Sequence, residues 1–325
     1  MRICVYGAGA MGGAIAGRLA RAGHEVSVVA RGAHGRAIAE RGLTLIEPDG
    51  SRWTTRPRVS ERPAELGRQD AVIVALKSNL FSDAAESMVP LLGPETLVVT
   101  AMNGVPYWYF HRHGGPHDGK RLASVDPGDR CWRLLGPERA IGTVLWMAGS
   151  VAEPGAIACG PGLGLPVGEP DGSRSTRVSA LAEALLSAGF EAPIKDRIRD
   201  ELWLKLWGNL SLNPITALTL GTLGASAGDE DAAWVAARMM EEARAIGQAL
   251  GVAFPTSIPE RLAMAAKLIG HKTSMHQDLE RGRRLELGAI VAAVVEMGAL
   301  AGIATPTVET VLRLARARAR TAGLD

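Results

Sequence analysis

Residues 3–12 of this 325-residue chain read ICVYGAGAMG, a short apolar run followed at once by three glycines in the spacing GxGxxG. The apolar run predicts a β-strand, and Ala10–Ala22 has the pattern of a helix. In such a unit, Gly7 permits a tight turn, Gly9 lets the backbone approach a pyrophosphate, and Gly12 allows close packing of the helix. The stretch therefore predicts a dinucleotide-binding loop; a glycine-rich turn without a ligand is the alternative.

The end of the second predicted strand indicates which dinucleotide is bound. Loops specific for NAD usually place an Asp or Glu there to bind the ribose hydroxyls. In this chain the strand Val26–Ala30 is followed by Arg31, whose guanidinium suits a 2′-phosphate in charge and in geometry. We therefore expect NADP, used as NADPH, as the cofactor; a solvated surface arginine is the competing interpretation.

Continuous apolar runs alternate with helical stretches in the first half of the chain, and such runs are typical of strands covered on both faces of a parallel sheet. The predicted strands are Ile3–Tyr6, Glu25–Ala30, Ala71–Leu76, Leu97–Thr100 and Ile141–Trp146. Helical periodicity dominates from about Asp196 onward. We predict an α/β fold class, with an N-terminal Rossmann-type NADP-binding domain over 1–195 and an all-α substrate and catalytic domain over 196–325.

The remaining segments are assigned from their periodicity and their Gly and Pro content. Segment 106–139 is interpreted as a long loop with some local structure, and loops of this length are usually functional or mobile. Short antiparallel strands are predicted over 153–172, a helix over 175–188 and an edge strand over 191–194. The helices predicted for the second domain are Arg199–Leu212, which Pro214 ends or kinks, Asp229–Leu250, Pro259–Ile269, Asp278–Ala301 and Pro306–Thr321.

Composition excludes several classes of protein. The 36 Lys and Arg against 34 Asp and Glu give a net charge of +2, too balanced to imply a nucleic-acid or membrane partner. The three cysteines lack the spacing of a disulfide framework or a zinc site, and no window approaches the roughly 20 apolar residues of a membrane span. His111, His113 and His117 are interpreted as loop residues and not as metal ligands. We expect a cytoplasmic protein without a metal.

Polar residues at two strand ends and on one helix form the candidate site. Lys77 and Asn103 each follow a predicted strand, at the sheet edge where ligands of α/β proteins bind. Lys205, Asn209 and Asn213 are spaced i, i+4, i+8 and share one helix face among apolar neighbours. A solvated face usually mixes both charges, so we interpret this set as functional.

The chain resembles the ketopantoate reductase family (2-dehydropantoate 2-reductase). The resemblance rests on GAGAMG with Arg31, on Lys77, on the turn Asn103-Gly104-Val105, on LWLKLWGNLSLNPITAL at 202–218 and on SMHQDLERGRRLE at 274–286, in family order along the whole chain. It implies a Rossmann-type oxidoreductase that uses NADPH to reduce 2-dehydropantoate to pantoate, a step toward pantothenate and coenzyme A.

The resemblance also implies a role for each matching residue. Lys205 matches the general acid, and Glu286 matches the glutamate that interacts with the substrate hydroxyl. The substrate-binding positions are Asn103, Asn209, Asn213 and Ser274, and the cofactor-binding positions are Gly7, Gly9, Ala10, Met11, Gly12, Arg31, Lys77 and Asn103. Hydride transfer builds negative charge on the ketone oxygen, so a lysine suits this chemistry if burial lowers its pKa from about 10.4.

Two features depart from the family pattern. After Glu286 the family tends to continue with an Asp and an Asn, where this chain has Gly288 and Val291, and segment 106–139 is longer than the compact family connection. The resemblance implies that both lie near the part of the site that sets substrate identity. The expected partner is a small 2-keto acid, and a homodimer is left open. The alternatives are an NADP-dependent reductase of another 2-keto acid and a non-catalytic NADP-binding sensor.

Overall fold

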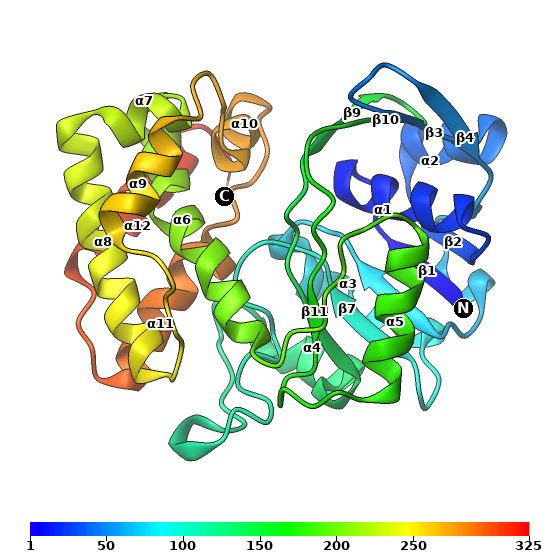
Figure 1. Cartoon of the computed structure of the whole chain (residues 1–325), viewed down its shortest axis with the longest axis horizontal. Helices are drawn as coiled ribbons and strands as arrows, with labels where there is room; N and C mark the ends of the chain where they lie inside the picture. Colours follow the sequence, from blue (N-terminus) through cyan, green and yellow to red (C-terminus); the bar gives the residue numbers. More distant parts are fainter. Residues whose placement is uncertain (325) are drawn as a thin grey trace. The chain divides into compact units, whose positions relative to one another are not determined.

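The structure, a computed structural model, describes residues 1–324 and divides into two compact units (Figure 1). The first unit contains the strands and comprises 1–102, 107–120 and 128–198. The second contains the chain from Arg199 onward together with 103–106 and 121–127, two short segments taken from the first half of the chain. The predicted domain limits, 1–195 and 196–325, stay a prediction; the change from strands to helices falls at Ile198.

The first unit is built on a seven-stranded sheet with the order β11-β8-β7-β6-β1-β2-β5. Its strands are β1 (Arg2–Tyr6), β2 (Glu25–Val29), β5 (Arg58–Ser60), β6 (Ala71–Val74), β7 (Leu97–Thr100), β8 (Ala140–Thr143) and β11 (Val167–Gly168). All neighbours pair in parallel except β11 with β8. The order of the six parallel strands is that of the dinucleotide-binding Rossmann fold. The predicted fold class is therefore confirmed.

The helices of the first unit cover this sheet and a smaller one. They are α1 (Ala10–Arg21), α2 (Gly32–Arg41), α3 (Phe81–Met88), α4 (Arg130–Leu135) and α5 (Thr176–Ser187). The second sheet has the order β4 (Arg52–Thr55), β3 (Leu43–Ile46), β10 (Ala156–Cys159) and β9 (Gly149–Glu153). Helix α1 contacts both sheets. Gly17 allows this approach, because a Cβ there would lie 2.3 Å from Leu45 Cδ1.

The predicted strands after residue 150 need two corrections. Antiparallel strands are present at β9 and β10, but β10 also pairs in parallel with β3. Segment 191–194 forms isolated parallel bridges with Gly164 and Val167 and no regular strand. Both differences arise because strand pairing depends on neighbours distant in sequence, which local alternation does not reveal.

The second unit is helical. Its elements are α6 (Ile198–Thr219), α7 (Leu223–Gly228), α8 (Glu230–Ala249), α9 (Ile258–Ala266), α10 (Ser274–Glu280), a π-helix at Gly288–Ala292, α11 (Ala293–Ala301) and α12 (Pro306–Thr321). Side chains at the helix starts explain two boundaries: Asp229 accepts from the Ala232 amide, and Ser257 forms a capping box with Glu260. Over residues 1–324, no helix is long and apolar enough to cross a membrane.

Two helix predictions in this unit are wrong in their bounds. Helix α6 continues past the predicted end at Leu212 and through Pro214 to Thr219, so this proline does not end the helix. The continuous helix predicted over 278–301 is interrupted, since α10 ends at Glu280 and Gly282 follows with φ of 62°. A left-handed glycine is a common helix terminator, and here it separates α10 from the π-helix.

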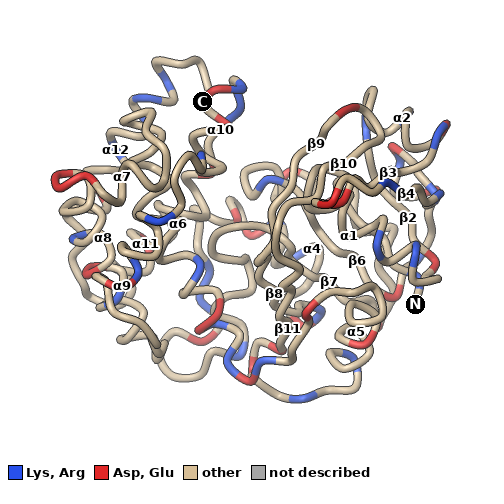
Figure 2. The backbone as a smooth tube through the Cα atoms, turned by 45° about the horizontal axis from the view of Figure 1, so that its top comes forward, with Lys and Arg blue, Asp and Glu red and all other residues tan. Residues whose placement is uncertain are grey.

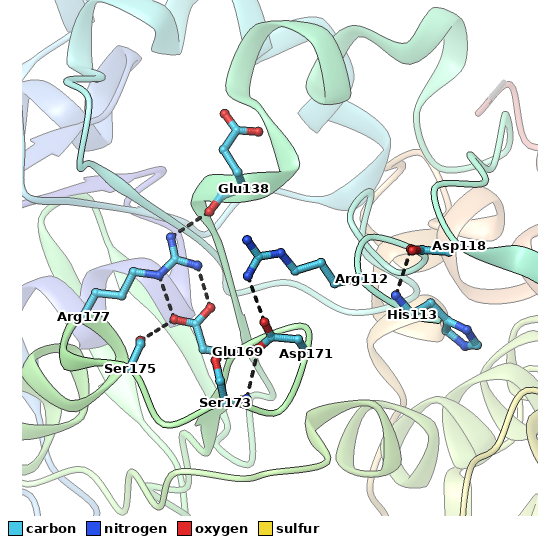
Figure 3. Close-up of polar contacts among 9 residues, drawn as sticks. All are labelled: Arg112, His113, Asp118, Glu138, Glu169, Asp171, Ser173, Ser175 and Arg177. Atoms are coloured by element: carbon cyan, nitrogen blue, oxygen red, sulfur yellow. Dashed lines mark hydrogen bonds and ion pairs between the residues drawn. The ribbon is translucent and has the colours of Figure 1, made fainter. Parts of the chain in front are cut away.

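The long segment 106–139 is partly a core element. Its four consecutive aromatic residues, Tyr107 to Phe110, are buried, and α4 lies in its last third. Figure 3 shows Arg112 of this segment pointing to Asp171, with Nη1 2.8 Å from Oδ2. Beside this pair, Arg177 donates to buried Glu169 and to the Glu138 carbonyl. These contacts attach both ends of the segment to the first unit.

Candidate functional site

The glycine loop after β1 has the backbone geometry that a pyrophosphate site requires. Gly7 has a φ of 101°, a conformation that favours glycine. A Cβ on Gly12 would lie only 1.9 Å from the Gly7 carbonyl oxygen, so the turn and the start of α1 touch directly. Gly9 is the N-cap of α1, and nothing lies within 4 Å of the place where its Cβ would be. The uncapped amides of this helix start are therefore suited to an anion.

Lys77 lies on the segment that packs against the glycine loop. The Ala75 amide donates to the Tyr6 carbonyl at 2.9 Å, and the Ala75 carbonyl would lie 2.9 Å from a Cβ on Gly7. Lys77 follows two residues later and is partly buried. The order of the sheet reverses between β1 and β6, the place where ligands of such sheets bind. The structure thus brings the segment of Lys77 beside the predicted cofactor loop.

Arg31 is exposed at the end of β2, where it forms the N-cap of α2. The next amide, that of Gly32, donates to Glu61 Oε1 at 3.0 Å. Glu61 follows β5, which pairs with β2, so one cation and one carboxylate lie near this strand end. The arginine retains the exposed position expected of a 2′-phosphate ligand.

Helix α6 presents Lys205, Asn209 and Asn213 from successive turns. Its apolar face includes Trp203 and Trp207, both fully buried. Burial lowers the pKa of Lys205 from 10.5 to about 8, and the carboxylate of Glu286 opposes this shift. A lysine with such a pKa exchanges protons near neutral pH, which an exposed lysine does not do efficiently.

Glu286 and Ser274 belong to the same helical unit as Lys205. Glu286 is 3% exposed and lies two residues before the π-helix. Ser274 is the first residue of α10, and the preceding Thr273 hydroxyl is 2.6 Å from the Thr216 hydroxyl of α6. This contact ties the start of α10 to the turn of α6 that follows Asn213.

Asn103 follows β7 in the chain but groups with the helical unit. The next residue, Gly104, has a φ of 94°, and a Cβ there would lie 2.7 Å from the Ala289 carbonyl oxygen. That same carbonyl accepts from the Val105 amide at 2.8 Å. The Asn103 turn is therefore anchored to the π-helix that begins just after Glu286.

The predicted residues fall into two sets. The predicted catalytic and substrate-binding residues lie in the helical unit: Asn103, Lys205, Asn209, Asn213, Ser274 and Glu286. The predicted cofactor-binding residues other than Asn103 lie in the sheet unit: Gly7, Gly9, Ala10, Met11, Gly12, Arg31 and Lys77. Their individual roles stay predictions.

Three features of the helical unit were not predicted from the sequence. The Arg261 guanidinium packs against Gly208 of α6, and burial lowers the pKa of Arg261. Ser124 hydrogen-bonds to Glu296, more than 170 residues further along the chain. Gly288 lies against Ser124, whose carbonyl oxygen would be 2.7 Å from a Cβ on that glycine. No local pattern marks these contacts, because each joins segments that are distant in sequence.

Charged residues of both signs lie throughout the chain outside this site. Figure 2 shows basic and acidic residues interspersed along both units. Within residues 1–324, no three His, Cys, Asp or Glu side chains are grouped so as to hold a metal ion. His113 and His117 of the long segment pack beside the Phe110 ring.

Comparisons with known proteins identify relatives over the whole chain. Residues 3–107 match the family model "Ketopantoate reductase PanE/ApbA" and residues 197–319 match its C-terminal counterpart. A 2-dehydropantoate 2-reductase of Mesorhizobium japonicum is 50% identical over 97% of each chain. A solved structure from Ralstonia solanacearum MolK2 is 40% identical with a TM-score of 0.95, over 100% of this chain and 99% of that one. A 2-dehydropantoate 2-reductase structure from Geobacter metallireducens is 27% identical with a TM-score of 0.85, over 98% and 99%.

The open space at Gly9 generates a prediction that separates binding from folding. Gly9→Ala adds a methyl group that meets no atom of the protein, yet it occupies the place where a pyrophosphate would approach. We expect an unchanged melting temperature and a dinucleotide Kd at least about tenfold higher by fluorescence titration. Gly228→Ala, whose Cβ also has nothing within 4 Å, is the matched control. Wild-type affinity in the Gly9 variant would contradict the assignment of this loop.

Proposed function

Because the chain belongs to the ketopantoate reductase family, we propose that it reduces 2-dehydropantoate to pantoate with NADPH, in the cytoplasm, on the route to pantothenate and coenzyme A. The main support for the proposal is the lowered pKa of Lys205. This lysine is partly buried and interacts with the buried Glu286, and its pKa is about 8. Ketone reduction needs a cationic proton donor of this kind at the oxygen that becomes negative. The name of the relative at 50% identity supports the choice of substrate.

The sheet unit fits an NADP molecule. The turn at Gly7 and the uncapped start of α1 at Gly9, Ala10 and Met11 would hold the pyrophosphate, while Arg31 would hold the 2′-phosphate. Lys77, beside the glycine loop, would lie near the nicotinamide end. The bound cofactor supplies the hydride.

The helical unit supplies the remaining chemistry. Hydride adds to the ketone carbon, the C=O π-bond breaks toward oxygen, and the Lys205 ammonium gives its proton to that oxygen. Glu286 raises the pKa of Lys205 and so keeps more of it protonated, and it also accepts a hydrogen bond from the new hydroxyl. Asn103, Asn209, Asn213 and Ser274 would orient the carboxylate and hydroxyl groups of the substrate through amide and hydroxyl donors.

Oligomeric state enters the proposal through exposed apolar side chains. Met264, Leu268 and Ile269, at the end of α9 and just after it, are each at least half exposed. Exposed apolar groups that lie close together are typical of association surfaces. We therefore include a homodimer in the proposal.

The reaction is tested by following NADPH absorbance with purified protein. We expect rapid oxidation with 2-dehydropantoate and slower oxidation with other 2-keto acids, and Lys205→Ala should lower kcat at least about 100-fold. Faster NADPH oxidation with a different 2-keto acid would instead identify the protein as a reductase of that acid. Tight NADPH binding without oxidation of any keto acid would identify the protein as a cofactor sensor.

The pH dependence of reduction reports on Lys205. Reduction needs the protonated ammonium, so kcat/KM should be constant below pH about 8 and fall about tenfold per pH unit above it. Glu286→Gln removes the carboxylate that raises the pKa of Lys205, so the alkaline limb should move to lower pH. Glu309→Gln, on the exposed face of α12, should leave the profile unchanged. A Glu286 variant with the wild-type profile would show that the two groups do not interact.

Cofactor choice is tested at Arg31. Arg31→Ala should raise the Kd of NADPH about 10- to 100-fold, because a charge-assisted bidentate contact to the 2′-phosphate is lost, and should leave the Kd of NADH unchanged. Arg41→Ala, at the opposite end of α2 and about 15 Å away along the helix, is the control. Equal weakening of both cofactors would contradict a role at the 2′-phosphate.

A further inference from the structure

Segment 121–127 leaves the sheet unit and docks on the helical unit. Leu122 and Val125 are 4% and 8% exposed, and a turn closes the segment through the Val125 amide and the Leu122 carbonyl. Glu296 of α11 holds it by three hydrogen bonds: Oε1 accepts from the Ala123 amide at 2.8 Å, and Oε2 accepts from the Ser124 amide at 3.0 Å and from the Ser124 hydroxyl at 2.6 Å. Such charge-assisted bonds hold a chain segment more firmly than neutral ones.

Gly288 makes room for this segment. A Cβ at residue 288 would lie 2.7 Å from the Ser124 carbonyl oxygen, which is closer than side chains approach backbone atoms. The φ of Gly288 is not in the left-handed region, so glycine is required here for space and not for backbone conformation. Any larger residue would push the segment away from the π-helix.

The π-helix also carries the turn of Asn103. Ala289, next to Gly288, accepts from the Val105 amide and lies against Gly104. Glu286 precedes the same π-helix by two residues. Glu296 therefore holds Ser124, and Ser124 lies against the π-helix. The π-helix in turn holds the turn of Asn103, and Glu286 lies just before it in the chain.

A π-helix is rare and occurs mostly as a single turn within an α-helix, frequently at a functional site. In this unit its support comes from two segments that belong to the first half of the chain, 103–106 and 121–127. Loss of one support would let residues 288–292 relax toward an ordinary helix. The chain on either side would then shift, including the backbone at Glu286.

We propose that Glu296 is a positioning residue for the substrate site: through segment 121–127 and Gly288 it fixes the π-helix that holds Asn103 and Glu286 in their places. This inference rests on the proposed function, because it assigns the two positioned side chains to the 2-keto acid and its hydroxyl product. The cofactor loop of the sheet unit takes no part in it.

The test compares Glu296→Ala, Gly288→Ala and the double variant by steady-state kinetics. Each single change should raise the KM for the 2-keto acid about tenfold. The Kd of NADPH, measured by fluorescence, should stay within about twofold of wild type, because every predicted cofactor-binding residue except Asn103 lies in the sheet unit. The double variant should be no worse than the more affected single variant, because both changes release the same segment. Glu296→Gln, which keeps one acceptor oxygen, should give an intermediate KM.

Two controls separate positioning from loss of folding. Glu309→Ala removes an exposed carboxylate paired with Arg313 and should leave both constants unchanged. All measurements are made well below each variant's melting temperature, and the NADPH Kd confirms a folded sheet unit. An unchanged keto-acid KM in Glu296→Ala and Gly288→Ala, or effects that multiply in the double variant, would overturn the inference. A wild-type protein that reduces no 2-keto acid would overturn the proposed function instead.

Discussion

A lysine ammonium held partly out of water beside a carboxylate is the interaction on which the functional account depends. Burial on α6 lowers the pKa of Lys205 to about 8, and Glu286 pulls it in the opposite direction. Neither influence alone suits a proton donor. Burial by itself would lower the pKa until the lysine is deprotonated, and a strong ion pair would raise the pKa until the lysine no longer gives up its proton. In the proposed reaction, the balance between them would set both the protonation and the position of the group at the developing oxyanion.

Glycines provide the close approaches that build both parts of the candidate site. Gly12 lies against the Gly7 carbonyl at the cofactor loop. Around the π-helix, the Ala289 carbonyl lies against Gly104 and the Ser124 carbonyl against Gly288. A side chain at any of the three would displace a main-chain segment. The glycine content of the chain, 39 residues, therefore has a specific use at a few positions, whereas most other glycines lie in turns and loops.

The sequence predicted the fold well where local patterns and the fold agree. Continuous apolar runs identified five of the six parallel strands of the seven-stranded sheet, whereas β5 was not predicted. The glycine spacing identified the first β-α-β unit. The i, i+4, i+8 spacing placed Lys205, Asn209 and Asn213 on one helix, as the structure has them. The docking of Ser124 on Glu296 was not predictable, because it joins segments that are distant in sequence and that no periodicity encodes. The break after Glu280 coincides with the left-handed Gly282, a local signal that the helical periodicity on both sides concealed.

The proposed role of Lys205 is to protonate the oxygen that receives the electrons of the reduced ketone. A crystal structure with NADP⁺ and pantoate tests it most directly. We expect Lys205 Nζ within about 3 Å of the pantoate 2-hydroxyl oxygen, with a Glu286 carboxylate oxygen accepting from that same hydroxyl. A complex in which another side chain or a water holds this oxygen, with the Lys205 ammonium turned away from it, would contradict the account.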